Sequence, residues 1–136
     1  EYVTEWGASF ELSASDAYFW QAQKTGCPLD EQSYAEETMR FAILPLDNAT
    51  TEALVDAAET AEELLEGELR VVAPDFQAIE VGVGIILAFD KSVATSSFPF
   101  SVKTDGAYGI FTEHLPEEFE FDAHYLIDEG GNDIDP

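Results

Sequence analysis

Short apolar runs separated by turn residues recur along most of this chain, and they predict a mainly β fold. Apolar and polar side chains alternate in residues 8–13 and 17–23, and the turn between these segments favours a hairpin. Further strands are predicted over residues 40–46, 69–73, 78–89, 98–103, 107–114 and 119–127. About eight strands at this spacing are typical of an antiparallel β-sandwich.

The periodicity changes between residues 50 and 66, where apolar side chains recur at steps of three and four residues. Thr50 is a suitable N-cap and Gly67 follows the last turn, so the pattern predicts one amphipathic helix packed on the sheet. The opposite face of this helix is acidic, and we expect it to lie in solvent. Its acidic residues are Glu52, Asp56, Glu59, Glu62, Glu63 and Glu66.

The composition is sufficient for one hydrophobic core, because 46% of the 136 residues are hydrophobic and 12% are aromatic. We expect a single β-sandwich domain over residues 1–136, with residues 129–136 forming a turn and a short extended end, or a frayed tail. No segment approaches the roughly 20 apolar residues of a membrane span, so direct membrane insertion is not expected. Gly82 and Gly84 interrupt the longest apolar run, and we interpret them as bulge or close-packing positions.

The charge is strongly unbalanced: 29 acidic residues against five basic ones give a formal net charge of −24. Such a surface repels nucleic acid and anionic membranes, so neither is expected as a partner. One explanation is solubility at high salt, as in a halophile, and another is the attraction of metal cations. The two explanations are compatible.

No arrangement for nucleophilic catalysis can be assembled, because the chain has only two histidines and ordinary strand hydroxyls near them. Carboxylate pairs are too numerous to indicate acid–base catalysis, and we expect a protein that is not an enzyme. The single cysteine, Cys27, excludes an internal disulfide and leaves the redox compartment open.

Both histidines, His114 and His124, lie in one acidic segment near the end of the chain. If residues 119–127 form a strand with Phe121 facing the core, then Asp122 and His124 share its opposite face. A hairpin with the preceding strand would set His114 beside Asp122 and within reach of His124. These imidazoles, with Glu113, Asp122 or Glu118 completing the shell, would bind zinc, copper or nickel.

The alternative interpretation of the same pattern involves no metal. His114 and His124 would then be partly exposed strand residues that pair with neighbouring acids.

Several short motifs near the two ends of the chain resemble a small, poorly characterised family of exported bacterial β-domain proteins. The motifs are FEL at 10–12, GAY at 106–108, FTEHLPEEF at 111–119 and DAHYL at 122–126. In that family a Glu-His pair precedes a Pro-x-Glu-Phe turn and a His-Tyr strand, and a His-rich tail often follows. The resemblance implies a compact β-domain that handles metal.

Together these features predict an extracytoplasmic transition-metal-binding or metal-delivery protein, with a membrane transporter component as partner. The chain begins at Glu1 without an initiator Met. We therefore expect either a mature exported protein, periplasmic or extracellular, or a piece of a longer protein. The alternative is a non-catalytic β-sandwich interaction module for protein or carbohydrate. In that case Trp6 and Trp20 would fill the core or touch the partner.

The excess of acidic residues predicts that salt stabilises the fold. We expect the melting temperature to rise with added salt, and also on acidification from pH 7 toward about 5, because both relieve repulsion among carboxylates. Thermal unfolding followed by circular dichroism across a salt series measures this effect. A melting temperature that does not respond to salt would contradict it.

Overall fold

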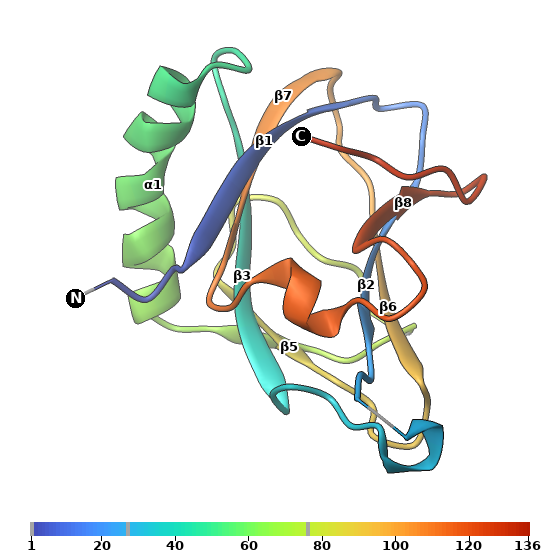
Figure 1. The fold of residues 1–136 in the computed structure, drawn as a ribbon. Helices are drawn as coiled ribbons and strands as arrows, with labels where there is room; N and C mark the ends of the chain where they lie inside the picture. Colours follow the sequence, from blue (N-terminus) through green and yellow to red (C-terminus); the bar gives the residue numbers. More distant parts are fainter. Residues whose placement is uncertain (1, 27, 76) are drawn as a thin grey trace.

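The computed structural model describes residues 2–26, 28–75 and 77–136, so Cys27 lies outside the described residues (Figure 1). Within them the chain is mainly β, with eight strands and one α-helix, which confirms the predicted class. The strands are β1 (Trp6–Leu12), β2 (Tyr18–Gln23), β3 (Thr38–Pro45), β4 (Arg70–Val72), β5 (Ile85–Ala88), β6 (Thr95–Phe100), β7 (Gly106–Thr112) and β8 (Leu126–Asp128). The helix is α1 (Thr51–Glu66), and two short 3-10 helices are η1 (Leu29–Glu31) and η2 (Pro116–Phe119).

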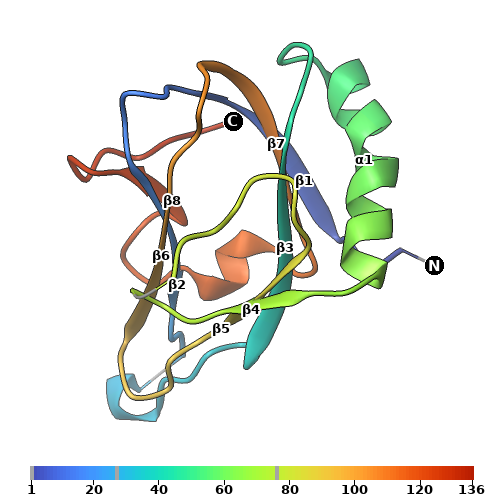
Figure 2. The same cartoon turned by 180° about the vertical axis from the view of Figure 1, so that it is seen from behind.

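The strands form two sheets in a sandwich-like arrangement (Figure 2). The five-stranded sheet has the order β1-β7-β3-β5-β4, and the three-stranded sheet has the order β6-β2-β8. Strand pairing is antiparallel throughout the named strands except between β4 and β5, which run parallel. The predicted antiparallel pairing is therefore corrected at the edge of the five-stranded sheet, where β4 runs parallel to β5.

The predicted hairpin of the first two strands is wrong, because β1 and β2 belong to different sheets. β1 pairs along its whole length with β7, and β2 pairs with β6 and β8. The turn between them is a corner, where the Asp105 carboxylate accepts the backbone N–H of Ala14 at 2.7 Å. Alternation of apolar residues predicts which face of a strand is buried, but it does not select the neighbouring strand.

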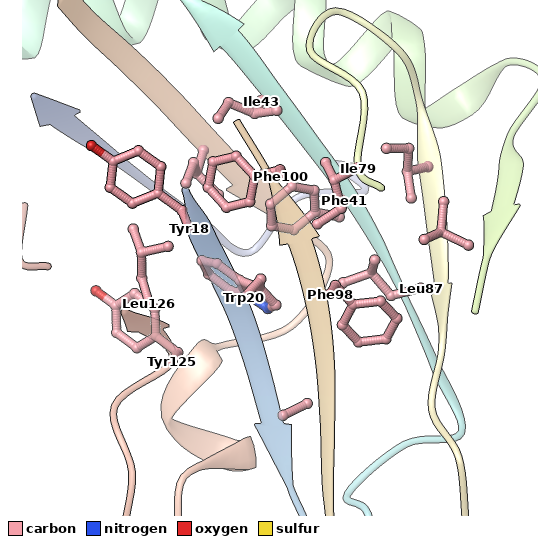
Figure 3. Close-up of a cluster of buried hydrophobic side chains, with 14 of the residues drawn as sticks. Tyr18, Trp20, Phe41, Ile43, Ile79, Leu87, Phe98, Phe100, Tyr125 and Leu126 are labelled. Atoms are coloured by element: carbon pink, nitrogen blue, oxygen red, sulfur yellow. The ribbon is translucent and has the colours of Figure 1, made fainter. Parts of the chain in front are cut away.

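The core between the sheets is largely aromatic, and Figure 3 shows its central part. Trp20 of β2 is 1% exposed, and its ring lies 4.9 Å from Phe41 of β3 and 5.1 Å from Tyr125. Each fully buried side chain of this size contributes about 2–3 kcal/mol through the hydrophobic effect. These contacts join the two sheets.

Helix α1 packs on the outer face of the five-stranded sheet, as the amphipathic pattern predicted (Figure 1). The Thr50 side chain accepts the backbone N–H of Ala53 at 3.1 Å, which confirms Thr50 as the N-cap. A second apolar cluster lies beneath the helix, where Ala61 meets Leu44 and Phe111 of the sheet.

Glu62 departs from the predicted solvent-exposed acidic face, since it is only 9% exposed. Burial raises the pKa of Glu62, but hydrogen bonds from the Thr4 hydroxyl and from the N–H groups of Val3 and Thr4 outweigh burial and lower it. Because the folded pKa lies below the unfolded one, this carboxylate stabilises the fold at neutral pH. That contribution is lost as the pH falls from the unfolded toward the folded pKa.

The strand predicted over residues 78–89 is much shorter, since only β5 (Ile85–Ala88) is a strand. The preceding residues bridge the two sheets: Ile79 N–H donates to Pro99 O at 2.9 Å, and Gly82 N–H donates to Ile43 O at 2.8 Å. Gly82 has a φ of +82°, a left-handed conformation that glycine adopts without strain. The segment therefore closes one side of the sandwich.

Residues 129–136 form a turn and an extended end. This is the first of the two expected forms, and the other was a frayed tail. Ile134 N–H donates to Leu126 O at 2.9 Å, and Asp133 forms an antiparallel bridge with Ile127. In the described parts of the chain, no helix has both the length and the apolar character needed to cross a bilayer.

Gly84 is a close-packing position, and substitution to alanine tests it. An added Cβ would lie 2.4 Å from the carbonyl oxygen of Leu64, which is backbone and cannot rotate away. We expect Gly84→Ala to lower the free energy of unfolding by about 1–3 kcal/mol in urea titrations. The control Gly130→Ala lies in an exposed turn, and an equal loss in both variants would contradict the close contact.

Candidate metal centre

Three side chains with metal-ligating groups meet where the start of β1, the end of β7 and η2 come together (Figure 1). They are Glu5, His114 and Glu118, and one ligand atom from each lies within 4.8 Å of the other two. Within residues 2–26, 28–75 and 77–136, this is the one group of at least three His, Cys, Asp or Glu side chains that meets this distance. It combines one predicted histidine and one predicted glutamate with a residue that sequence reasoning did not find.

Thr112, at the end of β7, positions two of the three ligands. Its carbonyl accepts the N–H of Glu5 at 3.0 Å, and its hydroxyl donates to the carbonyl of His114 at 2.6 Å. Thr112 is fully buried, so these bonds form away from water. The backbone of Glu5 and the backbone of His114 are therefore both hydrogen-bonded to the end of β7.

Glu118 is held by the loop that leads into η2. Its carboxylate accepts the N–H of Leu115 at 3.1 Å, and its own N–H donates to Leu115 O at the same distance. The side chain therefore turns back toward the loop that carries His114. A carboxylate has two oxygens, so this bond leaves one of them for a cation.

The site is accessible from solvent. The His114 side chain is 24% exposed, and Glu5 and Glu118 are exposed. Ligand atoms around a tetrahedral zinc ion lie about 3.4 Å apart, given bonds of about 2.0–2.1 Å. The distances between the three ligand atoms would have to shorten slightly to bind zinc. The exposed glutamate side chains can shorten them by rotating about their single bonds.

Glu113 lies beside His114 but is directed to Arg40. Its carboxylate accepts the Arg40 N–H at 3.1 Å and lies 3.8 Å from the guanidinium Nε. The distance from Glu113 to His114 Nε2 is also 3.8 Å, which is too long for a hydrogen bond. Glu113 is therefore a neighbour of the cluster and is not one of its three members.

The hairpin that was predicted to unite His114, Asp122 and His124 is not formed. Residues 116–119 are the 3-10 helix η2, and β8 (Leu126–Asp128) is only three residues long. Phe121, predicted to face the core, is 51% exposed.

The physical reason is a buried amide, Gln23 at the end of β2. Its carbonyl oxygen accepts the N–H groups of Phe121, Asp122 and Ala123 at 2.8–3.0 Å, which folds this segment into a loop. Its amide nitrogen donates to the Asp122 carboxylate at 2.7 Å. Asp122 is therefore bonded to Gln23 and does not join His114.

His124 lies outside the cluster, and both of its ring nitrogens face acceptors in the protein. Nδ1 lies 3.1 Å from the Glu120 carboxylate, and Nε2 lies 2.9 Å from Ile134 O and 3.2 Å from the Asp135 carboxylate. This is the pairing with acids that the alternative interpretation expected. His124 connects the loop after η2 to the C-terminal segment.

Tyr125 packs against the His124 ring, with 4.1 Å between the ring centroids. Burial, together with the nearby carboxylates of Glu117, Glu120 and Asp135, raises the pKa of Tyr125 to about 12. Its hydroxyl therefore stays neutral at physiological pH, and Tyr125 has a packing role.

Comparison with protein-family models, with curated proteins and with solved structures finds no match for this chain. The resemblance to exported metal-handling proteins stays a prediction, and the geometry of the site is the basis for proposing a function.

The Gln23 amide can be tested as the anchor of the loop. We expect Gln23→Leu to lower the free energy of unfolding by about 2–4 kcal/mol, because three N–H groups lose one buried acceptor. Hydrogen exchange should quicken at residues 121–123. Gln21→Leu, two residues earlier on the same strand, is the control, and equal effects in the two variants would contradict the anchoring role.

Proposed function

We propose that this chain binds a divalent transition-metal ion through Glu5, His114 and Glu118. The supporting observation is that one imidazole and two carboxylates, from residues just before β1, just after β7 and within η2, lie within 4.8 Å of one another. In the cell, the protein would act as an extracytoplasmic metal-binding or metal-delivery protein. A component of a membrane transporter would be its partner.

The ligand set favours borderline cations. Imidazole nitrogen with carboxylate oxygen suits zinc, nickel and copper(II), whereas copper(I) prefers sulfur ligands. Met39, the single methionine, is fully buried in the core and offers no thioether at the surface. Zinc and nickel are therefore the first ions to test.

The three protein ligands would leave one coordination position of the metal open. An open position supports a role in metal delivery better than a structural role. Structural zinc sites are usually closed by four protein ligands, whereas three ligands leave a position for water or for a group from another molecule. The exposure of Glu5 and Glu118 would let an acceptor reach the ion. The net charge of −24 would raise the local concentration of cations around the site.

In the alternative function, a non-catalytic interaction module for protein or carbohydrate, Trp6 and Trp20 would fill the core or touch the partner. Trp20 is buried, and Trp6 packs on Trp20 and Tyr125 at centroid distances of 6.2 and 5.4 Å. Both rings pack inside the fold and supply no evidence for a partner surface, whereas the cluster of Glu5, His114 and Glu118 is an observation that favours metal binding.

The two histidines provide a matched test. We expect His114→Ala to weaken zinc or nickel binding at least tenfold, about 1.4 kcal/mol, in titration calorimetry. His124→Ala should leave the affinity unchanged. Affinity should also fall as the pH is lowered, because protons compete with the metal for imidazole.

Two results would contradict this function. Binding that is undiminished in His114→Ala and persists at pH 5 would show that the ion interacts only with the general acidity of the surface. An equal loss in both histidine variants would point to a site shared by the two imidazoles.

A further inference from the structure

We propose that Glu62 of α1 is a positioning residue for this metal site: by holding residues 3 and 4, it sets the place of the ligand Glu5. The inference rests on the proposed function. It makes metal affinity depend on a side chain of the helix that does not touch the ion.

The Glu62 carboxylate accepts three hydrogen bonds from the segment just before Glu5. Val3 N–H donates to one oxygen, while Thr4 donates to the other from its N–H at 3.2 Å and from its hydroxyl at 2.6 Å. Glu62 is 9% exposed, so the bonds are shielded from water. Charge-assisted bonds of this kind are about twice as strong as neutral ones.

The backbone leading into the site is therefore held from two sides. The helix holds residues 3 and 4 through Glu62, and β7 holds Glu5 itself through the Thr112 carbonyl, at 3.0 Å from the Glu5 N–H. Without Glu62, this segment would keep the bond from Glu5 to β7 and the strand pairing that follows it, and it would lose these bonds to the helix.

Apolar packing does not replace this polar connection. A shallow groove of about 220 Å³, open to solvent, lies between α1 and the start of β1, lined by residues 4–7 and by Leu54, Val55 and Ala58 among others. The surface is therefore hollowed between the helix and the start of the strand. The Glu62 carboxylate is what brings residues 3 and 4 to the helix.

Residues that orient a ligand from outside the first coordination shell typically change metal affinity by about 10–100-fold when they are mutated. We expect Glu62→Gln and Thr4→Val to weaken zinc binding about tenfold, measured at a temperature where circular dichroism shows each variant folded. Thr4→Ser keeps the hydroxyl and should retain affinity. Glu63→Gln removes the same charge from the exposed neighbour on α1 and should change affinity less than twofold.

A double-mutant cycle separates positioning from stability. If Glu62 acts through Glu5, then Glu62→Gln should have no further effect on affinity once Glu5→Gln has removed the ligand. With cobalt(II) as a spectroscopic probe, Glu62→Gln should shift the visible spectrum of the wild-type complex toward that of Glu5→Gln. A role in stability alone would lower the melting temperature and leave both readouts unchanged.

Several outcomes would overturn the inference while the proposed function stands. These are unchanged affinity in folded Glu62→Gln and Thr4→Val, additive effects with Glu5→Gln, or an equal loss in Glu63→Gln. If Glu62→Gln does not fold, Thr4→Val and Thr4→Ser decide the question alone. Failure of the wild-type protein to bind zinc, nickel and cobalt would reject the proposed function, and this inference with it.

Discussion

The packing of aromatic side chains between the two sheets is the interaction on which the rest of this structure depends. Trp20 lies at its centre and contacts Trp6 of β1, Phe41 of β3 and Tyr125 before β8. Because these contacts join both sheets, they bring the first strand, the seventh strand and the segment around η2 to one side of the molecule. The candidate metal site lies where these elements meet, so its geometry depends on a core that contributes no ligand.

Buried polar side chains hold the irregular segments that the strands leave unpaired. Gln23 accepts three consecutive N–H groups of the loop after η2, Glu62 accepts two N–H groups before β1, and the Thr112 hydroxyl donates to the carbonyl of His114. Among the described residues, no buried side-chain nitrogen or oxygen lacks a hydrogen-bond partner. A buried backbone N–H without an acceptor costs about 1–3 kcal/mol, which explains why these positions are polar in an otherwise apolar interior.

The carboxylates of this chain have different roles despite its uniform negative charge. Glu62 and Glu118 bind backbone N–H groups, and Glu113 pairs with Arg40. Many of the other acids lie in solvent, where they repel one another and are screened by salt. Among the described residues, Glu5 and Glu118 are the acids that form the cluster with His114, so their location, and not their charge, distinguishes them from the remaining acids.

The amino-acid sequence by itself determined the β class, the helix with Thr50 as its cap and the aromatic core, and it named His114 and Glu118 as candidate ligands. These features depend on local periodicity, capping and residue type, all of which act over a few residues. The tertiary structure alone decided that β1 pairs with β7, that Gln23 turns the predicted strand around His124 into a loop, and that Glu5 meets His114 from the opposite end of the chain. Alternation specifies a buried face but not a partner strand, and a bond between residues about a hundred positions apart leaves no local pattern.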